Sequence, residues 1–223
     1  MGPRGEHTRN DKYERILKGA GVIFARYGYF NSKVSQIARE ANVADGTIYL
    51  YFKNKEDILL RFFEERMDEI ISLLQERLKP IDNVFARIRE YVYWHFSIVR
   101  EDPELIEVIT VELRQSAKFM KEYTNDKFKE YLDIISYVIR EGKDQGLIRE
   151  DVHPGVIKRG LFGMIDELLL LSVLRSRVAD SDVEEMARQV TELLVRGIAK
   201  DPEEALRQCF GTTDMTRNSS QTL

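Results

Sequence analysis

The sequence predicts an all-α protein in which a small N-terminal three-helix unit precedes a larger helical body. Two observations support this fold. Apolar residues recur every three or four positions along most of the chain, and Pro, Gly and Asp stand at the ends of these segments. With 223 residues, 43% of them hydrophobic, the chain is long enough for one large domain or for a small and a larger one.

The first predicted helix ends at Gly28, because glycine suits the left-handed conformation that closes a helix. A short second helix follows, and Ser32 is its expected cap. The residues expected to face inward have helical spacing: Ile16, Leu17, Ala20, Ile23, Phe24 and Tyr27 in the first helix, and Val34, Ile37, Ala38 and Ala41 in the second.

A tight turn at 42–44 leads to a third predicted helix from Gly46 to Phe52, with Asp45 as its expected cap. Ile48 and Phe52, four residues apart, are its core pair. The opposite face carries an unusual amount of aromatic and hydroxyl surface for so short a helix: Thr47, Tyr49, Leu50 and Tyr51.

Two short helices joined by a turn and packed on a longer one form the helix-turn-helix pattern. In this pattern a short helix enters the DNA major groove, while hydroxyls, lysines and helix N-termini hold phosphates. Thr47 and Tyr49 can donate to phosphates, and Lys53 and Lys55 bracket the start of the next helix. The pattern alone also fits an ordinary three-helix core with half-buried tyrosines.

The charge is divided unevenly along the chain. The whole chain carries a net charge of −4, but residues 1–55 contain ten Lys and Arg against five Asp and Glu. A basic head at net +5 on a body at net −9 indicates that one end meets a polyanion, although chance fluctuation of charge gives the same division.

Several runs in the head closely resemble the DNA-binding domain of TetR-family repressors. They are Gly28-Tyr29, Val34-Ser35-Gln36-Ile37-Ala38, Ala41-Asn42-Val43 and the stretch from Gly46 to Leu59. The resemblance covers residues 12–60. It implies a homodimer that binds a palindromic double-stranded DNA operator and is released by a small molecule held in a C-terminal helical domain.

By family analogy, DNA contacts fall at the starts of the second and fourth helices and on the third. Asp45 is a departure, because family members often carry lysine or a polar group there. The Asp45 carboxylate would accept a hydrogen bond from a cytosine amino group or would make no contact with the DNA. The expected DNA-binding residues are Ser32, Lys33, Ser35, Asp45, Gly46, Thr47, Tyr49, Tyr51, Lys53 and Lys55.

The body is predicted to begin after Lys55, with a long helix from Glu56 to Leu78 that Pro80 ends. Further helices are expected at 82–100, 103–117, 119–142, 154–177 and 181–200. The chain thus divides into a helix-turn-helix domain at 1–55, a ligand-binding and dimerisation domain at 56–200, and a polar tail at 201–223 that is expected to be mobile.

Two late helices are predicted to form a dimer face, because 154–177 is apolar on more than one side and 181–200 adds a second apolar stripe. The family resemblance implies the same four-helix interface. The alternative is burial within one chain. The expected interface residues are Phe162, Ile165, Leu169, Val173, Val190, Leu194 and Ile198.

The middle helices gather aromatic residues, which either fill a plain core or line a pocket. Segments 112–116 and 162–167 resemble the fatty-acid-degradation branch of the family, the TetR-type FadR repressors. That resemblance implies a long-chain acyl-coenzyme A inducer and no cofactor. The expected ligand-binding residues are Tyr91, Trp94, His95, Phe96, Arg114, Gln115, Phe162, Gly163 and Asp166.

Arg114 is the candidate contact for the coenzyme A phosphates, because arginine pairs with phosphate through two parallel hydrogen bonds. An ion pair with Asp166 or Glu167 is the alternative. A repressor of an efflux pump that senses amphipathic drugs suits Trp94 and the tyrosines equally well.

An all-α enzyme with an accessory DNA-binding head is a second alternative. No Gly-rich phosphate loop or nucleophile elbow is present, and the three histidines and single cysteine lie far apart. We therefore expect neither a catalytic residue nor a metal ligand.

The first ten residues lack the apolar core of a signal peptide, and the run from Leu168 to Leu174 is far shorter than the ~20 residues that span a bilayer. Cys209, the single cysteine, cannot form an internal disulfide. These features predict a cytoplasmic protein without membrane contact.

Overall fold

The computed structural model describes residues 4–101, 108, 126–174 and 180–211. Within these ranges the regular structure is helical apart from one isolated bridge between Ile148 and Ala199. The described residues fall into two compact units. The first, here called the head, holds the described residues up to Glu69 with residue 108, Asp126 and Lys127, and the second, the body, holds 70–101 and the described residues from 128 onward.

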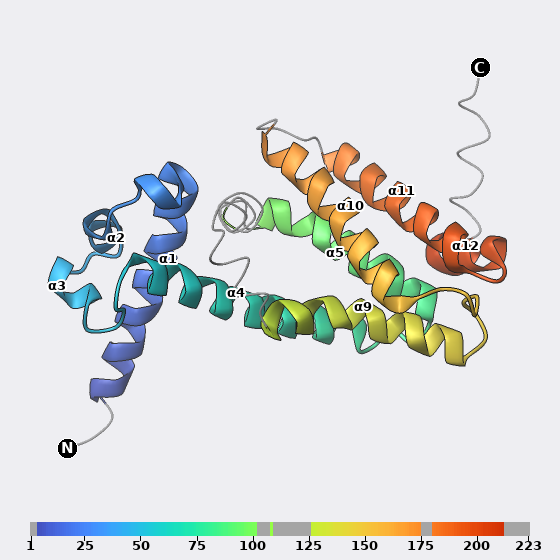
Figure 1. Cartoon of the computed structure of the whole chain (residues 1–223), viewed down its shortest axis with the longest axis horizontal. Helices are drawn as coiled ribbons and strands as arrows, with labels where there is room; N and C mark the ends of the chain where they lie inside the picture. The colour runs from blue at the N-terminus through green and yellow to red at the C-terminus, as the bar shows by residue number, and fades with distance from the viewer. Residues whose placement is uncertain (1–3, 102–107, 109–125, 175–179, 212–223) are drawn as a thin grey trace. The chain divides into compact units, whose positions relative to one another are not determined.

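The head contains α1 (Arg4–Asn31), α2 (Val34–Glu40), α3 (Asp45–Ile48) and the start of α4 (Lys55–Leu78) (Figure 1). The predicted break at Gly28 is confirmed, because this residue has a φ of 73° and a ψ of 156° inside α1. A residue with a side chain is strained at such a positive φ, which explains the glycine. α4 passes from the head into the body, so the boundary between the units lies inside this helix rather than before it.

The core of the head is small and apolar, and the predicted inward faces are confirmed except at Tyr27, which is 40% exposed, and Val34, which is half-buried. Its fully buried members include Ile16, Ala20, Phe24, Ile37, Ala38 and Ile48. α1 and α4 approach each other closely at Gly21, where a Cβ atom would lie 2.7 Å from the ring of Phe62. Gly21 is therefore required by packing rather than by backbone conformation.

Two details of the helix-turn-helix differ from the prediction. The N-cap of α2 is Lys33 rather than Ser32, and the Gln36 side chain accepts a hydrogen bond from the Lys33 backbone N–H at 2.7 Å. α3 ends at Ile48 rather than at Phe52, with Ala44 as its N-cap. The backbone N–H groups of Tyr51 and Phe52 still donate to the Ile48 carbonyl at 3.0 Å, so the chain keeps a helical path.

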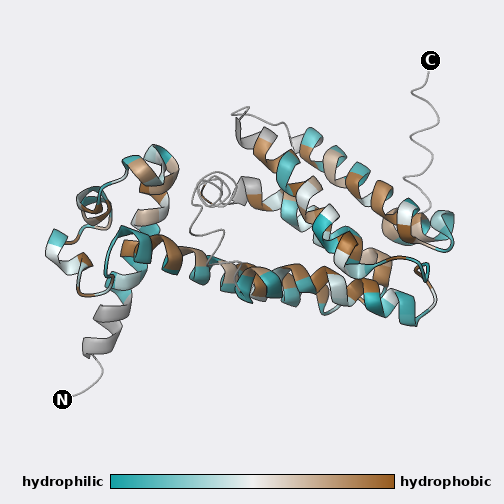
Figure 2. Cartoon of the chain, viewed as in Figure 1, coloured by the Kyte–Doolittle hydropathy of each residue, from teal (hydrophilic) through white to brown (hydrophobic). Residues whose placement is uncertain are grey.

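The body contains α5 (Val84–Glu101), α9 (Asp126–Asp144, whose first two residues belong to the head), α10 (Pro154–Leu174), α11 (Asp180–Ile198) and α12 (Pro202–Phe210). α5 packs against α10, α11 and α12 (Figure 1). α9 and α11 alternate between hydrophobic and hydrophilic segments along their lengths, as expected for amphipathic helices that cover a core (Figure 2). Apart from residue 108, the predicted helix at 103–117 and the first part of that at 119–142 lie outside the described residues.

Helix α12 corrects the prediction of a mobile polar tail from residue 201. Asp201 caps the helix by accepting from the Glu204 backbone N–H at 3.0 Å, and Pro202 occupies its first turn. Its inward side chains Ala205, Leu206 and Cys209 are buried, since α12 packs on α5 and α11. Burial raises the pKa of the Cys209 thiol to about 12, and the thiol donates to the Phe85 carbonyl oxygen at 3.3 Å.

Candidate nucleic-acid interface and ligand site

The face of α3 that the sequence assigns to DNA is open to solvent. Tyr49 is 59% exposed, and Asp45 and Gly46 are exposed beside the half-buried Thr47. The core pair Ile48 and Phe52 faces the other way and is buried. This arrangement presents a short, uncovered helix of the kind that fits the DNA major groove.

Three predicted phosphate contacts flank this face. Lys33 and Ser35 are exposed at the start of α2, and Lys53 is exposed just before α4. Tyr51 lies differently, because it is half-buried with its ring centroid 6.3 Å from that of Tyr13. We infer that Tyr51 mainly supports the face, whereas Lys33, Ser35 and Lys53 remain available to phosphates.

Ser32 does not belong to the DNA-contacting set. Its side chain is buried, and the hydroxyl donates to the carbonyl oxygens of Gly28 at 2.6 Å and Ile23 at 3.1 Å. The Gly28 carbonyl also accepts the Ser32 backbone N–H at 3.1 Å, and both carbonyls lie at or before the break in α1. The hydroxyl therefore satisfies the main chain of the head and does not reach a phosphate.

Lys55 requires a similar correction. Its ammonium group donates to the carbonyl oxygens of Tyr29 at 2.6 Å, Ser32 at 2.8 Å and Phe30 at 3.2 Å. It also lies 4.5 Å from the centroid of the Tyr29 ring. Partial burial lowers the pKa of Lys55. Because an ammonium group has three protons, all of its donors are used within the head.

Lys55 is the first residue of α4, so these bonds connect the start of α4 to the last residues of α1 and to Ser32, which follows α1. Sequence reasoning missed this role because a lysine beside a DNA-binding motif suggests a phosphate contact. The available signal was the helix end that precedes Val34, since the last carbonyl groups of a helix have no intrahelical donor.

In the body, the structure brings four of the predicted ligand residues into one aromatic cluster. Tyr91, Trp94 and His95 come from α5, and Phe162 comes from α10. Phe128 and Tyr131 of α9 complete the cluster, with the Phe128 and Phe162 ring centroids 5.0 Å apart and the His95 and Tyr131 centroids 5.3 Å apart. Tyr131 is the member that connects the polar and aromatic parts of this cluster.

The polar atoms inside the cluster satisfy one another. His95 Nδ1 must donate to the Tyr91 carbonyl oxygen, because a carbonyl only accepts. Burial lowers the pKa of His95 to about 4, so the ring is neutral and its Nε2 accepts from the Tyr131 hydroxyl. The Tyr131 and Tyr91 hydroxyls also share a hydrogen bond. Burial raises the pKa of both tyrosines, so neither ionises near neutral pH.

The remaining predicted ligand residues are separated. Phe96 is buried in α5, and Asp166 is buried in α10. Gly163 lies instead on the exposed face of α10, where it is better placed to meet another molecule than to line an interior pocket. Arg114 and Gln115 lie outside the described residues.

The predicted dimer residues need a larger correction. Ile165 and Leu169 of α10 and Val190, Leu194 and Ile198 of α11 are all buried within the single chain. Phe162 is half-buried in the aromatic cluster, and the Val173 side chain lies outside the described part. Periodicity identified apolar stripes on these helices but not which stripe faces the core of the same chain.

The outward faces of α10 and α11 carry a different set of apolar and small residues. Val156 is 66% and Leu193 is 64% exposed. Gly160 and Gly197 are exposed, and no described atom lies within 4 Å of a Cβ built on either of them. Glycines on an exposed helix face allow a second helix to approach closely.

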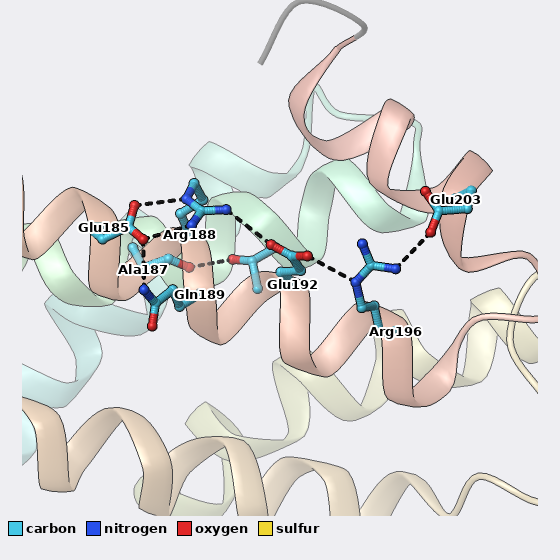
Figure 3. A network of polar contacts seen from close by, with 8 residues as sticks. Glu185, Ala187, Arg188, Gln189, Glu192, Arg196 and Glu203 are labelled. Carbon is cyan, nitrogen blue, oxygen red and sulfur yellow. Dashed lines mark hydrogen bonds and ion pairs between the residues drawn. The ribbon is translucent and has the colours of Figure 1, made fainter. Parts of the chain in front are cut away.

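A ladder of ion pairs runs along α11 beside this apolar stripe and ends on α12 (Figure 3). Arg188 pairs with Glu185 at 2.7 Å and with Glu192 at 3.0 Å, and Arg196 connects Glu192 to Glu203. The hydrogen bond from Arg188 lowers the pKa of Glu185 to about 2. These charges therefore have partners within the chain and need none from another molecule.

Within the described ranges, no group of three or more His, Cys, Asp or Glu side chains is placed to hold a metal ion. None of the helices that the structure describes has the length and apolar character needed to cross a membrane.

Comparison with known proteins agrees with this architecture. Residues 16–62 match the family model of bacterial regulatory proteins of the tetR family, and residues 63–197 match that of the YsiA-like protein C-terminal region. The fatty acid metabolism regulator protein of Bacillus subtilis is 37% identical over 85% of this chain and 97% of its own length.

Two solved structures have the same fold along nearly their whole length. The transcriptional regulator FadR from Bacillus subtilis in complex with stearoyl-CoA has a TM-score of 0.77 at 37% identity and covers 83% of this chain and 98% of its own. The fatty acid degradation regulator FadR from Bacillus halodurans has a TM-score of 0.77 at 32% identity and covers 82% and 94%. This chain belongs to the TetR family of bacterial transcriptional regulators.

Proposed function

We propose that this protein is a repressor of fatty-acid degradation genes that leaves its operator when it binds a long-chain acyl-coenzyme A. The observation that carries the proposal is the similarity to a FadR bound to stearoyl-CoA, because it spans both the head and the body. The relatives are regulators of transcription, which supports a binding protein rather than an enzyme. A DNA-binding regulator acts in the cytoplasm.

The described part of the body supports an apolar ligand. Phe128, Phe162 and Tyr131 form an aromatic surface across α9 and α10, and the polar atoms of His95 and Tyr91 are satisfied within the protein. An acyl chain needs apolar neighbours and no hydrogen-bond partners, which such a surface provides. Arg114 remains our candidate contact for the coenzyme A phosphates.

The proposed repressor is a homodimer formed through the outward faces of α10 and α11. Val156 and Leu193 are large apolar side chains in the open, and Gly160 and Gly197 allow close helix approach. Two copies that meet here would place two heads on one palindrome, about one DNA turn (~34 Å) apart. An inducer that favours a different spacing of the heads by a few kcal/mol would release the DNA.

The ligand class is tested by calorimetric titration of the full chain with stearoyl-CoA, free stearate, coenzyme A and tetraphenylphosphonium. We expect the acyl thioester to bind at least tenfold more tightly than the other three. Preferential binding of tetraphenylphosphonium would instead support a drug-sensing repressor, and indifference to every acyl thioester would refute the acyl-coenzyme A proposal.

A pair of variants locates the site. Phe162→Ala removes a ring from the aromatic cluster and should weaken stearoyl-CoA binding about tenfold. Tyr137→Ala removes a ring that is 66% exposed on α9 and should leave binding unchanged. Circular dichroism melting of both variants shows whether weaker binding reflects the missing ring or an unfolded body.

A further inference from the structure

Leu50 is not among the expected DNA contacts, but its side chain is unusually exposed. At 74%, it is the most exposed large hydrophobic side chain in the part of the chain that the structure describes. It directly follows Tyr49 at the end of α3 and supplies almost nothing to the core of the head. Single exposed leucines are common on protein surfaces. The position of Leu50 on the head therefore decides whether its exposure indicates a function.

The hydrogen bonds around Leu50 place it at the centre of the outward face. The Leu50 N–H donates to the Thr47 carbonyl at 3.1 Å, and that of Phe52 donates to the Ile48 carbonyl at 3.0 Å, so the path is helical. At about 100° per residue, Leu50 points roughly 180° from the midpoint of the buried pair Ile48 and Phe52. Its helical neighbours on that face are Gly46 and Thr47.

The surroundings of Leu50 leave it open to a large partner. Gly46, four residues earlier, has no side chain, and no described atom lies within 4 Å of where its Cβ would be. Lys53, three residues later, is exposed and positively charged. Leu50 is therefore an exposed apolar side chain beside an open glycine and close in sequence to an exposed cation, on the side of the head that would meet DNA.

The chemistry of DNA restricts what a leucine can contact there. Its side chain neither donates nor accepts a hydrogen bond, so it cannot hold a phosphate or recognise a polar base edge. Thymine presents a C5-methyl group in the major groove, and apolar side chains pair with that methyl. We propose that Leu50 contacts a thymine methyl in each half of the operator and thereby determines sequence preference at that base pair.

This inference rests on the proposed function only in that the head binds DNA, and it does not depend on the inducer. Burial of one methyl group contributes about 0.8 kcal/mol, which is about a fourfold change in affinity. Loss of the methyl in both half-sites would therefore weaken binding about fifteenfold, provided that the two contacts are independent.

The test uses the highest-affinity duplex that the full-length protein selects from a randomised DNA pool. This duplex is resynthesised with uracil in place of each thymine in turn, because uracil pairs like thymine but lacks the methyl. We expect one symmetry-related pair of positions at which uracil weakens wild-type binding about fifteenfold. In Leu50→Ala the same change should have less than a twofold effect.

Leu50→Met keeps an apolar side chain of similar length and should keep the dependence on the methyl. Leu73→Ala, which removes a leucine that is 53% exposed on α4 in the body, should behave as wild type toward every duplex. Because Leu50 is exposed, these substitutions should not unfold the head, which thermal melting verifies.

Two results would overturn the inference while leaving DNA binding intact: tolerance of uracil at every position, or the same loss at one position in wild type and in Leu50→Ala. If no duplex is enriched by the wild-type protein, the DNA-binding function itself fails, which is a distinguishable outcome.

Discussion

Two polar sites, one in the head and one in the body, differ in the partners that join their helices. In the head, the Ser32 hydroxyl and the Lys55 ammonium group donate to main-chain carbonyls near the break at Gly28. In the body, His95 and Tyr131 bond to each other across α5 and α9. The backbone fixes the position of a main-chain carbonyl acceptor. A side-chain acceptor, in contrast, can be substituted together with the donor that binds it.

The outer faces of the head and the body also differ in the chemical groups that they present. Hydroxyl, aromatic and lysine groups surround α3, whereas α10 and α11 present apolar and glycine residues beside charges that are already paired. The first surface suits a polyanion and the second suits a copy of the same chain.

The largest effect is expected at the outer face of α11. Leu193→Glu places a carboxylate where two copies are proposed to meet, so the dimer dissociation constant should rise at least 100-fold. Sedimentation velocity measures this change, and Tyr137→Glu on α9 is the matched control that should remain dimeric. This interface would be contradicted if Leu193→Glu remained dimeric at the protein concentrations at which the wild type is dimeric.

Replacement of Lys55 tests the main-chain role found in the head. Lys55→Met removes a charged donor from three carbonyls and should lower the free energy of unfolding by about 2–3 kcal/mol. Urea denaturation of the full chain measures the loss. Operator affinity should fall as well, but its dependence on salt should not change, because the Lys55 ammonium group neutralises no phosphate. An unchanged stability with a shallower salt dependence would restore Lys55 to the phosphate contacts.

The buried histidine predicts a pH dependence for the body. The pKa of His95 is about 4 in the folded chain and 6.5 in the unfolded chain, so the unfolded chain binds the proton more readily. The neutral ring therefore contributes stability above pH 6.5 that is lost as the pH falls toward 4. Between pH 7 and pH 5 the free energy of unfolding should drop by about 2 kcal/mol.

His95→Gln removes the titrating ring, so its stability should be nearly constant over the same pH interval. His153 is exposed and provides the control, because His153→Gln should keep the wild-type pH profile. Parallel profiles for wild type and His95→Gln would show that another group is responsible.

The smallest effect is expected at Lys33, which is exposed at the N-cap of α2. Lys33→Ala should change the free energy of unfolding by less than about 0.5 kcal/mol. It should reduce the slope of log affinity against log salt by about 1 for each phosphate that the lysine neutralises in the wild type. Fluorescence anisotropy at several salt concentrations measures this slope, and an unchanged slope would remove Lys33 from the interface.

The helices and most of the buried positions of the head could be predicted, because these positions have distinct backbone or packing roles. Gly28 needs a positive φ, and Ile48 and Phe52 must both face inward. Ser32 and Lys55 were misassigned because a hydroxyl or ammonium group has the same donors whether its partner is a phosphate or a main-chain carbonyl.

The body could be predicted only as a set of helices. Ile165 and Val190 were assigned to the dimer because α10 is apolar on more than one side and α11 adds a second apolar stripe. Periodicity does not tell which of these surfaces meets the same chain. α12 escaped detection because it has only three buried residues in nine and precedes a polar segment. The meeting of His95 with Tyr131 depends on how α5 packs against α9, which local sequence does not encode.

Release of this regulator from DNA by an acyl-coenzyme A can be measured directly. Fluorescence anisotropy would measure the affinity of the full-length protein for its selected duplex with and without saturating stearoyl-CoA. We expect at least a tenfold loss of affinity with stearoyl-CoA and none with free coenzyme A. An unchanged affinity, at concentrations where calorimetry shows that stearoyl-CoA is bound, would contradict the claim.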